Sequence, residues 1–335
     1  MTKFLEENLE EQERAYTSFA TNLGLIPLIL EKDAWVCWAL DALFTIGDGV
    51  QMAFKGGTSL SKVYNAISRF SEDIVITISY ESLDSAINPF DQTLSSKERK
   101  RQASAMIDRY RQYVKEVIKP HFNKLLSSQF PGRDWKLEVL EDGEILNFYY
   151  PAAVKVGGEL GYVDQVVKLE FGGRNATTPT ETRRVIPYIH AMVGESELPA
   201  AEVAVLSPER TFWEKATLAH VECNRVGLKV DRNRLSRHWY DLYKLADHEI
   251  GRRALNNKDL LTDVVRFKKI FFHTGYANYD ECLTGGLKLV PPDETIETLK
   301  LDYENMIEQG MFQDDPPTFD DIIARLRALE AEINA

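Results

Sequence analysis

The chain has 335 residues, of which 44% are hydrophobic and 27% charged, and its formal net charge is −12. A chain of this length and composition can bury a sizeable core, which excludes a disordered protein and leaves room for two globular domains. It has no stretch near the roughly 18 apolar residues of a membrane span and no apolar leader segment, so we expect a cytoplasmic protein without a membrane partner.

The first predicted elements surround a pair of glycines. Residues 8–44 have apolar residues at helical spacing, with a break at Gly24 and Pro27, which predicts interrupted helical structure. Residues 52–55 form a short strand-like run that ends at Gly56-Gly57, and residues 58–67 return to helical spacing. The sequence therefore predicts a strand, a glycine turn and a helix in that order.

A second strand follows this helix. Residues 74–78 are rich in β-branched side chains, which favour strands. We place Ser71-Glu72-Asp73 at the start of the same strand, where alternation puts Ser71 and Asp73 on one face.

A basic helix comes next. Residues 95–126 predict a long helix that stops near Pro120. Between Lys97 and Lys119 the chain holds eight basic and three acidic residues, a net charge of +5. This run is either a solvated helix face or an RNA-contacting surface, and the sequence leaves both readings open.

Further strands are predicted in the middle of the chain. Residues 135–140 and 145–151 form a predicted strand pair around Asp142-Gly143. Residues 166–171 then alternate as a strand that carries Lys168 and Glu170 on one face. A second strand with a carboxylate is therefore available beside the one that carries Asp73.

The remainder is predicted to be mostly helical, beginning at Ser207-Pro208 with proline at the first helical position. The last helix starts with a capping box of Thr318 and Asp321. The acidic end of the chain, residues 292–335, has a net charge of −9. The predicted fold class is a bilobed α+β protein, with a mixed sheet and flanking helices at residues 1–200 and a helical domain at residues 201–335.

Three cysteines are too far apart in the sequence to form a C-x-x-C pair. They are Cys37, Cys223 and Cys282. An odd number of isolated cysteines suits a reducing compartment, so we expect buried thiols.

The glycine turn is the first candidate for a functional site. Two glycines between a strand and a helix let the backbone approach a phosphate, because no Cβ is in the way and the helix start offers free N–H groups. A glycine pair by itself is more often a plain turn. The sequence lacks a Walker P-loop, a dinucleotide fingerprint, a nucleophile elbow and an H-E-x-x-H motif, which excludes several common enzyme classes.

The segment after the turn makes the site specific. Asp73 lies sixteen positions after Gly57, the spacing that a nucleotidyltransferase uses. Residues 54–62 and 69–74 together resemble the first motif of the AbiEii/AbiGii toxin family, within the polymerase-beta-type nucleotidyltransferases. The resemblance spans roughly residues 25–333, and its further blocks are Glu31-Lys32-Asp33 and residues 168–171, 207–216, 237–243, 302–306 and 317–321.

The resemblance implies a nucleotidyltransferase-type α/β domain and a toxin function. The implied reaction transfers a nucleoside monophosphate from a nucleoside triphosphate to an RNA hydroxyl, with the 3′ end of tRNA as the expected acceptor. The oxygens on either side of the α-phosphate need charge stabilisation, which Mg²⁺ or Mn²⁺ ions held by carboxylates provide. A cognate antitoxin is the expected protein partner, in a toxin–antitoxin or phage abortive-infection pair.

The resemblance also assigns roles to individual residues. Asp73 is the matching metal ligand, and Ser71 belongs to the site beside it. Glu170 is a candidate third carboxylate, with a structural partnership to Lys168 as its alternative role. In the C-terminal part, Lys215 matches a cation for the triphosphate, and Asp241 matches a carboxylate that orients Lys215 or the substrate. The nucleotide-binding residues implied by the first motif are Gly56, Gly57, Thr58, Ser59 and Lys62.

One position departs from the family pattern. Nucleotidyltransferases of this type carry a second acidic residue two positions after the first, and here that position is Val75. Valine cannot bind Mg²⁺, so the catalytic rate is expected to fall. Either Glu72 or Glu170 compensates, or the chain is a naturally inactive relative, or the valine is an introduced inactivating substitution. Alternation along a strand makes Glu72 the weakest substitute, and we favour inactivation.

Three functions therefore compete. The first is a toxin enzyme that adds nucleotides to RNA. The second is a binding module that holds a nucleoside triphosphate or an antitoxin without chemistry, as Val75 suggests. The third is a protein kinase-like phosphotransferase, whose glycine-rich loop and H-R-D and D-F-G blocks are missing from the sequence.

Overall fold

The computed structural model describes residues 3–155, 164–194, 197–225, 227 and 234–335. These residues form two compact units, each of which is described by itself. Unit 1 comprises residues 1–63 and 70–206, and unit 2 comprises residues 64–69 and 207–335. The predicted domains, residues 1–200 and 201–335, are each one continuous stretch of the chain. In the structure, residues 64–69 belong to unit 2, although the residues on either side of them belong to unit 1.

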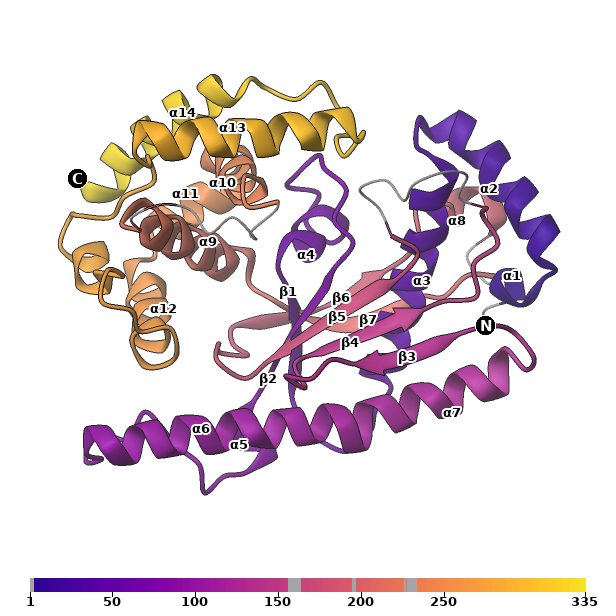
Figure 1. The fold of residues 1–335 in the computed structure, drawn as a ribbon, viewed down its shortest axis with the longest axis horizontal. Coiled ribbons are helices and arrows are strands. Elements are labelled where there is room, and N and C mark those ends of the chain that lie inside the picture. The colour runs from indigo at the N-terminus through magenta and orange to yellow at the C-terminus, as the bar shows by residue number, and fades with distance from the viewer. Residues whose placement is uncertain (1–2, 156–163, 195–196, 226, 228–233) are drawn as a thin grey trace. The chain divides into compact units, whose positions relative to one another are not determined.

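Unit 1 is built on a mixed sheet (Figure 1). In the part of the chain that the structure describes, this sheet has seven strands in the order β3-β4-β5-β2-β1-β7-β6. Two pairs are parallel, β2 with β5 and β1 with β7, and the other neighbours are antiparallel. The strands are β1 (Met52–Lys55), β2 (Ile74–Ile78), β3 (Lys136–Val139), β4 (Ile145–Tyr149), β5 (Val167–Gly172), β6 (Thr180–Val185) and β7 (Ala201–Leu206).

The strands predicted within residues 52–55, 74–78, 135–140, 145–151 and 166–171 are confirmed. The sequence prediction missed β6 and β7, and it placed the domain boundary across β7. β7 alternates between exposed and buried residues from Ala201 to Val203, a period-two pattern that predicts a strand. β6 gives a weak signal, because its first five residues are exposed.

Helix α3 (Pro27–Phe44) supplies the aromatic core of unit 1. It packs against β5 and β7, and Trp35 and Trp38 are buried at its centre. The ring of Trp35 stacks on Tyr150 at 5.7 Å, and Trp38 packs edge-on against Phe122 at 5.8 Å. The predicted break before this helix is confirmed, because α2 (Leu9–Leu23) ends in a left-handed Gly24 cap and Pro27 starts α3.

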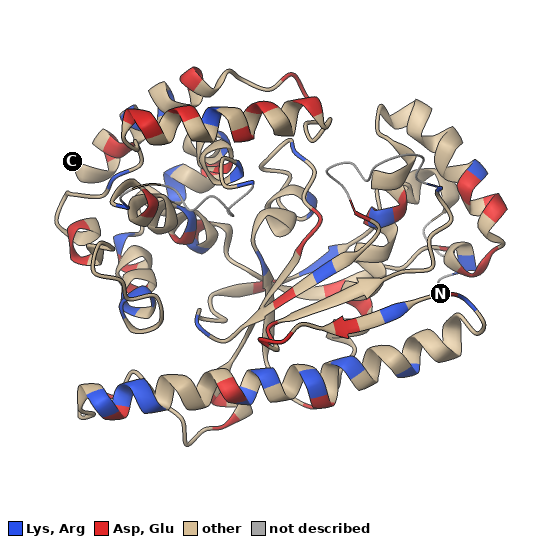
Figure 2. Cartoon of the chain, viewed as in Figure 1, with Lys and Arg blue, Asp and Glu red and all other residues tan. Residues whose placement is uncertain are grey.

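The basic helix is longer than predicted. It runs without interruption through α6 (Ser96–Tyr113), a π-helical segment η1 (Val114–Ile118) and α7 (Lys119–Gln129). The predicted stop near Pro120 is therefore wrong. Pro120 has no amide hydrogen to donate, and it is the second residue after the π-helical segment, where the regular i→i−4 ladder is already interrupted. Figure 2 shows the positions of the basic residues as blue bands along the ribbon of α6.

Two local predictions near the glycine turn also differ from the structure. Helix α4 (Gly57–Lys62) ends five residues before the predicted end at Ile67. Residues 71–73 lie outside β2 and are irregular, so strand alternation does not orient Ser71 and Asp73. The remaining helices of unit 1 are short: α1 (Lys3–Glu6), α5 (Tyr80–Leu83) and α8 (His190–Val193).

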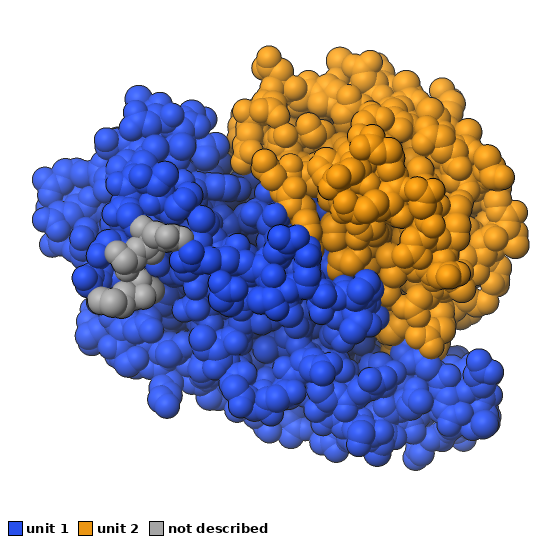
Figure 3. Space-filling model, turned by 180° about the vertical axis from the view of Figure 1, so that it is seen from behind, with its two compact units in different colours: residues 1–63, 70–206 blue, residues 64–69, 207–335 orange. Residues whose placement is uncertain are grey.

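Unit 2 is helical apart from a bridge between Arg69 and Phe312 and is coloured separately in Figure 3. Ser207 caps the first helix and Thr318 forms the predicted capping box of the last, so both predictions are confirmed. The helices are α9 (Pro208–Cys223), α10 (Arg237–Asp247), α11 (Glu249–Leu255), α12 (Lys258–Phe271), η3 (Tyr279–Leu283), α13 (Asp293–Glu308) and α14 (Phe319–Asn334).

Two predictions made from composition can be compared with the structure. The three cysteines are free and buried, as expected. None of the helices within the described residues combines the length and the apolar character that crossing a membrane would require.

Candidate functional site

The glycine turn of unit 1 brings the end of β1 against β2. Gly56 has φ +87°, a conformation that side chains other than glycine rarely adopt. A Cβ at this position would lie 3.3 Å from Cγ2 of Val75. Glycine is therefore required both by the backbone angle and by the closeness of the neighbouring strand.

The hydroxyl groups of the turn hold the candidate site together. Thr58 Oγ1 donates to the carbonyl oxygen of Asp73 at 2.6 Å and lies 2.9 Å from Ser71 Oγ. Ser59 Oγ donates to the carbonyl oxygen of Gly56 at 2.9 Å. The side chains of Thr58 and Ser59 are buried, so they fix the turn beside Ser71 and Asp73.

Glu72 points away from this group. Its carboxylate forms an ion pair with Lys32 at 2.6 Å, and both side chains are buried. Ser71 and Asp73, on either side of it, are only half-buried. Because its carboxylate is already engaged in the interior, Glu72 is not available to replace the ligand missing at Val75.

Helix α3 also holds the other end of the turn. Asp33, next to Lys32, forms a buried ion pair with Lys62, the last residue of α4. Lys62 Nζ also lies 4.1 Å from the centre of the Tyr188 ring. Burial alone favours the neutral amine, but the Asp33 carboxylate outweighs it and raises the pKa of Lys62. We infer that Lys62 anchors α4, and that Lys32 and Asp33 together hold both sides of the glycine turn.

Glu31, the first residue of the Glu31-Lys32-Asp33 triplet on α3, is also buried, but the hydrogen bonding of its carboxylate is incomplete. Its Oε1 accepts hydrogen bonds from the backbone N–H groups of Ala153 and Val154. Its Oε2 has no hydrogen-bond partner among the described residues. Burial raises the pKa of Glu31 from 4.5 to about 7, although the two backbone donors oppose the shift.

Glu31 therefore predicts a pH-dependent stability. Because its folded pKa lies above 4.5, the folded state holds the proton more tightly, and the free energy of unfolding falls as pH rises from 4.5 towards 7. The change amounts to about 3 kcal/mol. Glu31→Gln is expected to remove this dependence in urea unfolding at pH 5 and pH 8, whereas the exposed control Glu11→Gln should keep it. An unchanged pH dependence in Glu31→Gln would contradict the prediction.

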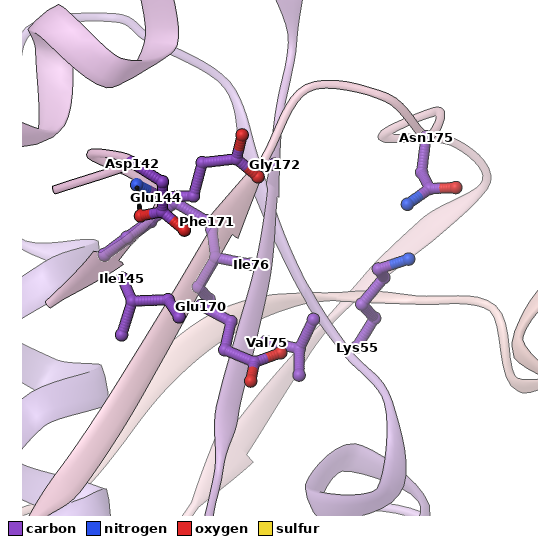
Figure 4. A pocket seen from close by; sticks show the side chains of 10 residues that line it. All are labelled: Lys55, Val75, Ile76, Asp142, Glu144, Ile145, Glu170, Phe171, Gly172 and Asn175. Atoms are coloured by element: carbon purple, nitrogen blue, oxygen red, sulfur yellow. Dashed lines mark hydrogen bonds between the residues drawn. The ribbon is translucent and has the colours of Figure 1, made fainter. Parts of the chain in front are cut away.

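A pocket of about 240 Å³ opens on the same sheet, beside the turn (Figure 4). Its lining includes Val75 on β2, Glu170 on β5 and Lys55 at the end of β1. Asn175, in the segment between β5 and β6, points toward Lys55 in the close-up view. Sequence reasoning assigned no role to Lys55 or Asn175. The position of Lys55 directly before Gly56-Gly57 was the available signal, whereas Asn175 gave none.

The carboxylates near this pocket do not fit a two-metal site. Val75 supplies no ligand, and the Glu170 carboxylate forms an ion pair with Lys168, the structural partnership that the sequence left open. Within the ranges that the structure describes, no group of three or more His, Cys, Asp or Glu side chains is arranged to hold a metal ion. Asp73 and Glu170 remain as single carboxylates, each short of the oxygen ligands that Mg²⁺ requires.

Unit 2 brings together the two site residues predicted in its sequence. Lys215 on α9 forms an ion pair with Asp241 on α10 at 2.7 Å. Arg69 contacts the same carboxylate through two nitrogens, at 2.7 and 2.8 Å. His238 Nδ1 lies 3.4 Å from Lys215 Nζ. Arg69 and His238 were not predicted, although both belong to sequence blocks that resemble the family.

The electrostatics of this cluster follow from its burial. Burial alone would raise the pKa of Asp241, but Arg69 and Lys215 lower it well below its ordinary value. Burial lowers the pKa of Lys215, and Asp241 opposes that effect. Desolvation, together with Lys215 and Arg237, holds the pKa of His238 well below its usual range. The cluster therefore holds Lys215 between a carboxylate and a neutral imidazole.

Comparison with known proteins gives a family and similar solved structures. Residues 38–325 match the model of a family described as nucleotidyl transferase AbiEii toxin, type IV TA system. Among solved structures the chain is similar to MenT4, a nucleotidyltransferase toxin from Mycobacterium tuberculosis H37Rv. That match has 18% identity and a TM-score of 0.47 and covers 98% of this chain and 89% of that chain. No curated protein matches the chain.

Proposed function

Because the chain belongs to the AbiEii family of nucleotidyl transferase toxins, we propose that it binds a nucleoside triphosphate on the turn at Gly56-Gly57 and is built to transfer the nucleoside monophosphate to an RNA hydroxyl. The proposed acceptor is the 3′ end of tRNA. A cognate antitoxin is the proposed protein partner. The observation that carries the proposal is the family match over residues 38–325, which includes the turn, Asp73, Lys215 and Asp241.

The residues of unit 1 would serve the reaction by position and charge. The turn presents the start of α4, where backbone N–H groups unused by the helix can bind phosphate oxygens. Ser71 and Asp73 are fixed beside it through Thr58. With an acid at position 75, Asp73 and Glu170 would be the proposed further carboxylates for a divalent ion, which would supply charge stabilisation at the transferred phosphate.

In unit 2, Lys215 and Asp241 are the proposed catalytic residues. The Lys215 ammonium is proposed to neutralise charge on the triphosphate. Asp241, held by Arg69, is proposed to fix the orientation of the Lys215 side chain. The contacts of Asp241 support its part of this proposal, because its carboxylate binds Lys215 and Arg69 at the same time.

We also propose that Val75 keeps this chain inactive or nearly so. Val75→Asp is expected to restore labelled nucleotide incorporation into tRNA in the presence of Mg²⁺. Charge stabilisation by a metal is worth several kcal/mol, so the expected gain is about 100-fold or more.

The control for this experiment separates charge from shape. Val75→Asn has the size of the aspartate but no charge, and it should stay at the level of the unmodified chain. Asp73→Asn added to Val75→Asp should abolish the gain. If Val75→Asp unfolds at the same denaturant concentration as the parent and still gives no incorporation, the inactivation by Val75 is ruled out.

The second candidate is a protein that binds a nucleotide or an antitoxin without catalysis. It is favoured by one observation, the carboxylate set around Val75, which does not fit a two-metal site. Nucleoside triphosphate binding without Mg²⁺-dependent pyrophosphate release, in the parent and in Val75→Asp alike, would support this candidate over the enzyme.

A further inference from the structure

Three hydroxyl groups lie at the glycine turn, and each carries a single proton. They belong to Thr58 and Ser59 on α4 and to Ser71 in the segment before β2. A hydroxyl can donate one hydrogen bond and accept two, whereas a carbonyl oxygen can only accept. The partners of these hydroxyls therefore decide in which direction each proton points.

The proton of Thr58 is committed to the backbone. Thr58 Oγ1 lies 2.6 Å from the carbonyl oxygen of Asp73 and 2.9 Å from Ser71 Oγ. Because the carbonyl cannot donate, the short contact with Asp73 takes the Thr58 proton. The contact between the two hydroxyls then uses the proton of Ser71, which Ser71 donates to Thr58 Oγ1.

This chain of hydrogen bonds is protected at its centre and open at one end. Thr58 is only 1% exposed, so water does not readily replace either of its partners. Ser71 is half-buried, and among the described residues its side chain has a hydrogen bond only with Thr58. The Ser71 oxygen therefore meets a ligand with its lone pairs, as an acceptor.

An acceptor at this place suits a donor on the ligand. The oxygens of a triphosphate are acceptors themselves, so one of them against Ser71 Oγ would leave two acceptors in contact without a proton between them. A sugar hydroxyl carries the missing proton. In a nucleotide the sugar is bonded directly to the α-phosphate, so its hydroxyls are the donors closest to the phosphate that the proposed reaction transfers beside Asp73.

We propose that Ser71 accepts a hydrogen bond from a sugar hydroxyl of the substrate, and that Thr58 is the positioning residue that keeps the Ser71 proton turned away from the ligand. The inference rests on the proposed function, because it takes a nucleoside triphosphate and an RNA 3′ end as the ligands of the site. The hydroxyl belongs either to the ribose of the triphosphate or to the terminal ribose of the RNA.

The test compares ligands with and without sugar hydroxyls. The full chain is titrated in Mg²⁺ buffer with the four ribonucleoside triphosphates and their 2′,3′-dideoxy counterparts, and with tRNA that ends in ribose or in 2′,3′-dideoxyribose. In one of the two comparisons the ligand with hydroxyls is expected to bind about 3- to 10-fold more tightly, the value of a neutral hydrogen bond. The comparison that shows this preference identifies the source of the hydroxyl.

Three variants connect the preference to the two side chains. Ser71→Ala removes the acceptor and is expected to abolish the preference. Thr58→Val keeps the shape of the side chain but frees the Ser71 proton to turn toward the ligand, so only part of the preference should remain. Thr58→Ser retains the hydroxyl and should bind like the parent, as should the control Ser104→Ala, an exposed serine on α6. If Thr58→Val does not fold, Ser71→Ala and Thr58→Ser decide the question.

The outcomes separate this inference from the proposed function. If the parent binds its ligands without a preference, or a folded Ser71→Ala keeps the preference, the role of Ser71 is overturned and the proposed function stands. The same holds if Ser71→Ala weakens both members of a pair equally, as loss of a contact with a phosphate or a metal ion would do. Full preference in a folded Thr58→Val overturns the role of Thr58. If neither the triphosphates nor tRNA bind to the parent, both the inference and the proposed substrates are wrong.

Discussion

Asp241→Asn is expected to lower the free energy of unfolding by about 3–5 kcal/mol at pH 7, the usual cost of removing one partner from a buried ion pair. Asp241 is completely buried and balances two cations, Arg69 and Lys215. Asparagine keeps the shape of the side chain but leaves both cations without a counter-charge. Part of the cost is relieved if Lys215 releases its proton, because burial already lowers its pKa.

The measurement is urea unfolding of the variant and of a control on the same helix. Asp247→Asn removes an exposed carboxylate that pairs with Arg325 at 2.9 Å, and exposed pairs contribute at most about 1 kcal/mol. Equal losses in Asp241→Asn and Asp247→Asn would refute the prediction.

The Asp241 carboxylate also predicts how the free energy of unfolding changes at acidic pH. The folded pKa of Asp241 lies below its ordinary value of 3.8, so its contribution is fully present above that value and is lost as pH falls through the folded pKa. Asp241→Asn should therefore lose most of its disadvantage relative to the parent in strongly acidic buffer.

Lys62→Met is the second large change and is expected to cost about 3–5 kcal/mol. It removes the partner of a buried carboxylate, Asp33, and the ammonium that lies over the Tyr188 ring. Asp33 also accepts a hydrogen bond from the Tyr188 backbone N–H at 2.7 Å. Without Lys62, the charge on Asp33 would stay buried without its ion-pair partner, so acidification that protonates Asp33 should recover part of the loss.

A double variant tests whether the unpaired charge is the cause. Lys62→Met with Asp33→Asn removes the buried charge and keeps an acceptor for Tyr188, so it should be more stable than Lys62→Met alone. The control is Lys136→Met, from an exposed pair with Glu138 at 3.1 Å. A double variant no more stable than Lys62→Met would show that the loss comes from packing and not from charge.

Much of the candidate site in unit 1 followed from local sequence. The glycine pair between a strand and a helix and the β-branched run after it predicted β1, the turn and β2. Period-two alternation also placed Lys168 and Glu170 together on one face of β5. These features depend on residues a few positions apart, for which backbone preferences and alternation decide the outcome.

The partners of the charged residues could not be predicted in this way. Lys32 meets Glu72 across 40 residues, and Arg69 meets Asp241 across 172 residues. Lys62 was predicted as a phosphate contact from its place after the turn, and its ion pair with Asp33, 29 residues away, was not predicted. Nothing in the spacing of a single lysine tells whether it faces solvent or a buried carboxylate.

The sequence by itself determined the family, the glycine turn and the departure at Val75, because each is a matter of which residues stand at fixed spacings. Only the tertiary structure decided that Lys55 is the neighbour of Val75 and that Glu72 is turned into the core. The physical reason is that strand register and the pairing of buried charges are set by contacts between segments far apart in the chain, which local propensity does not encode.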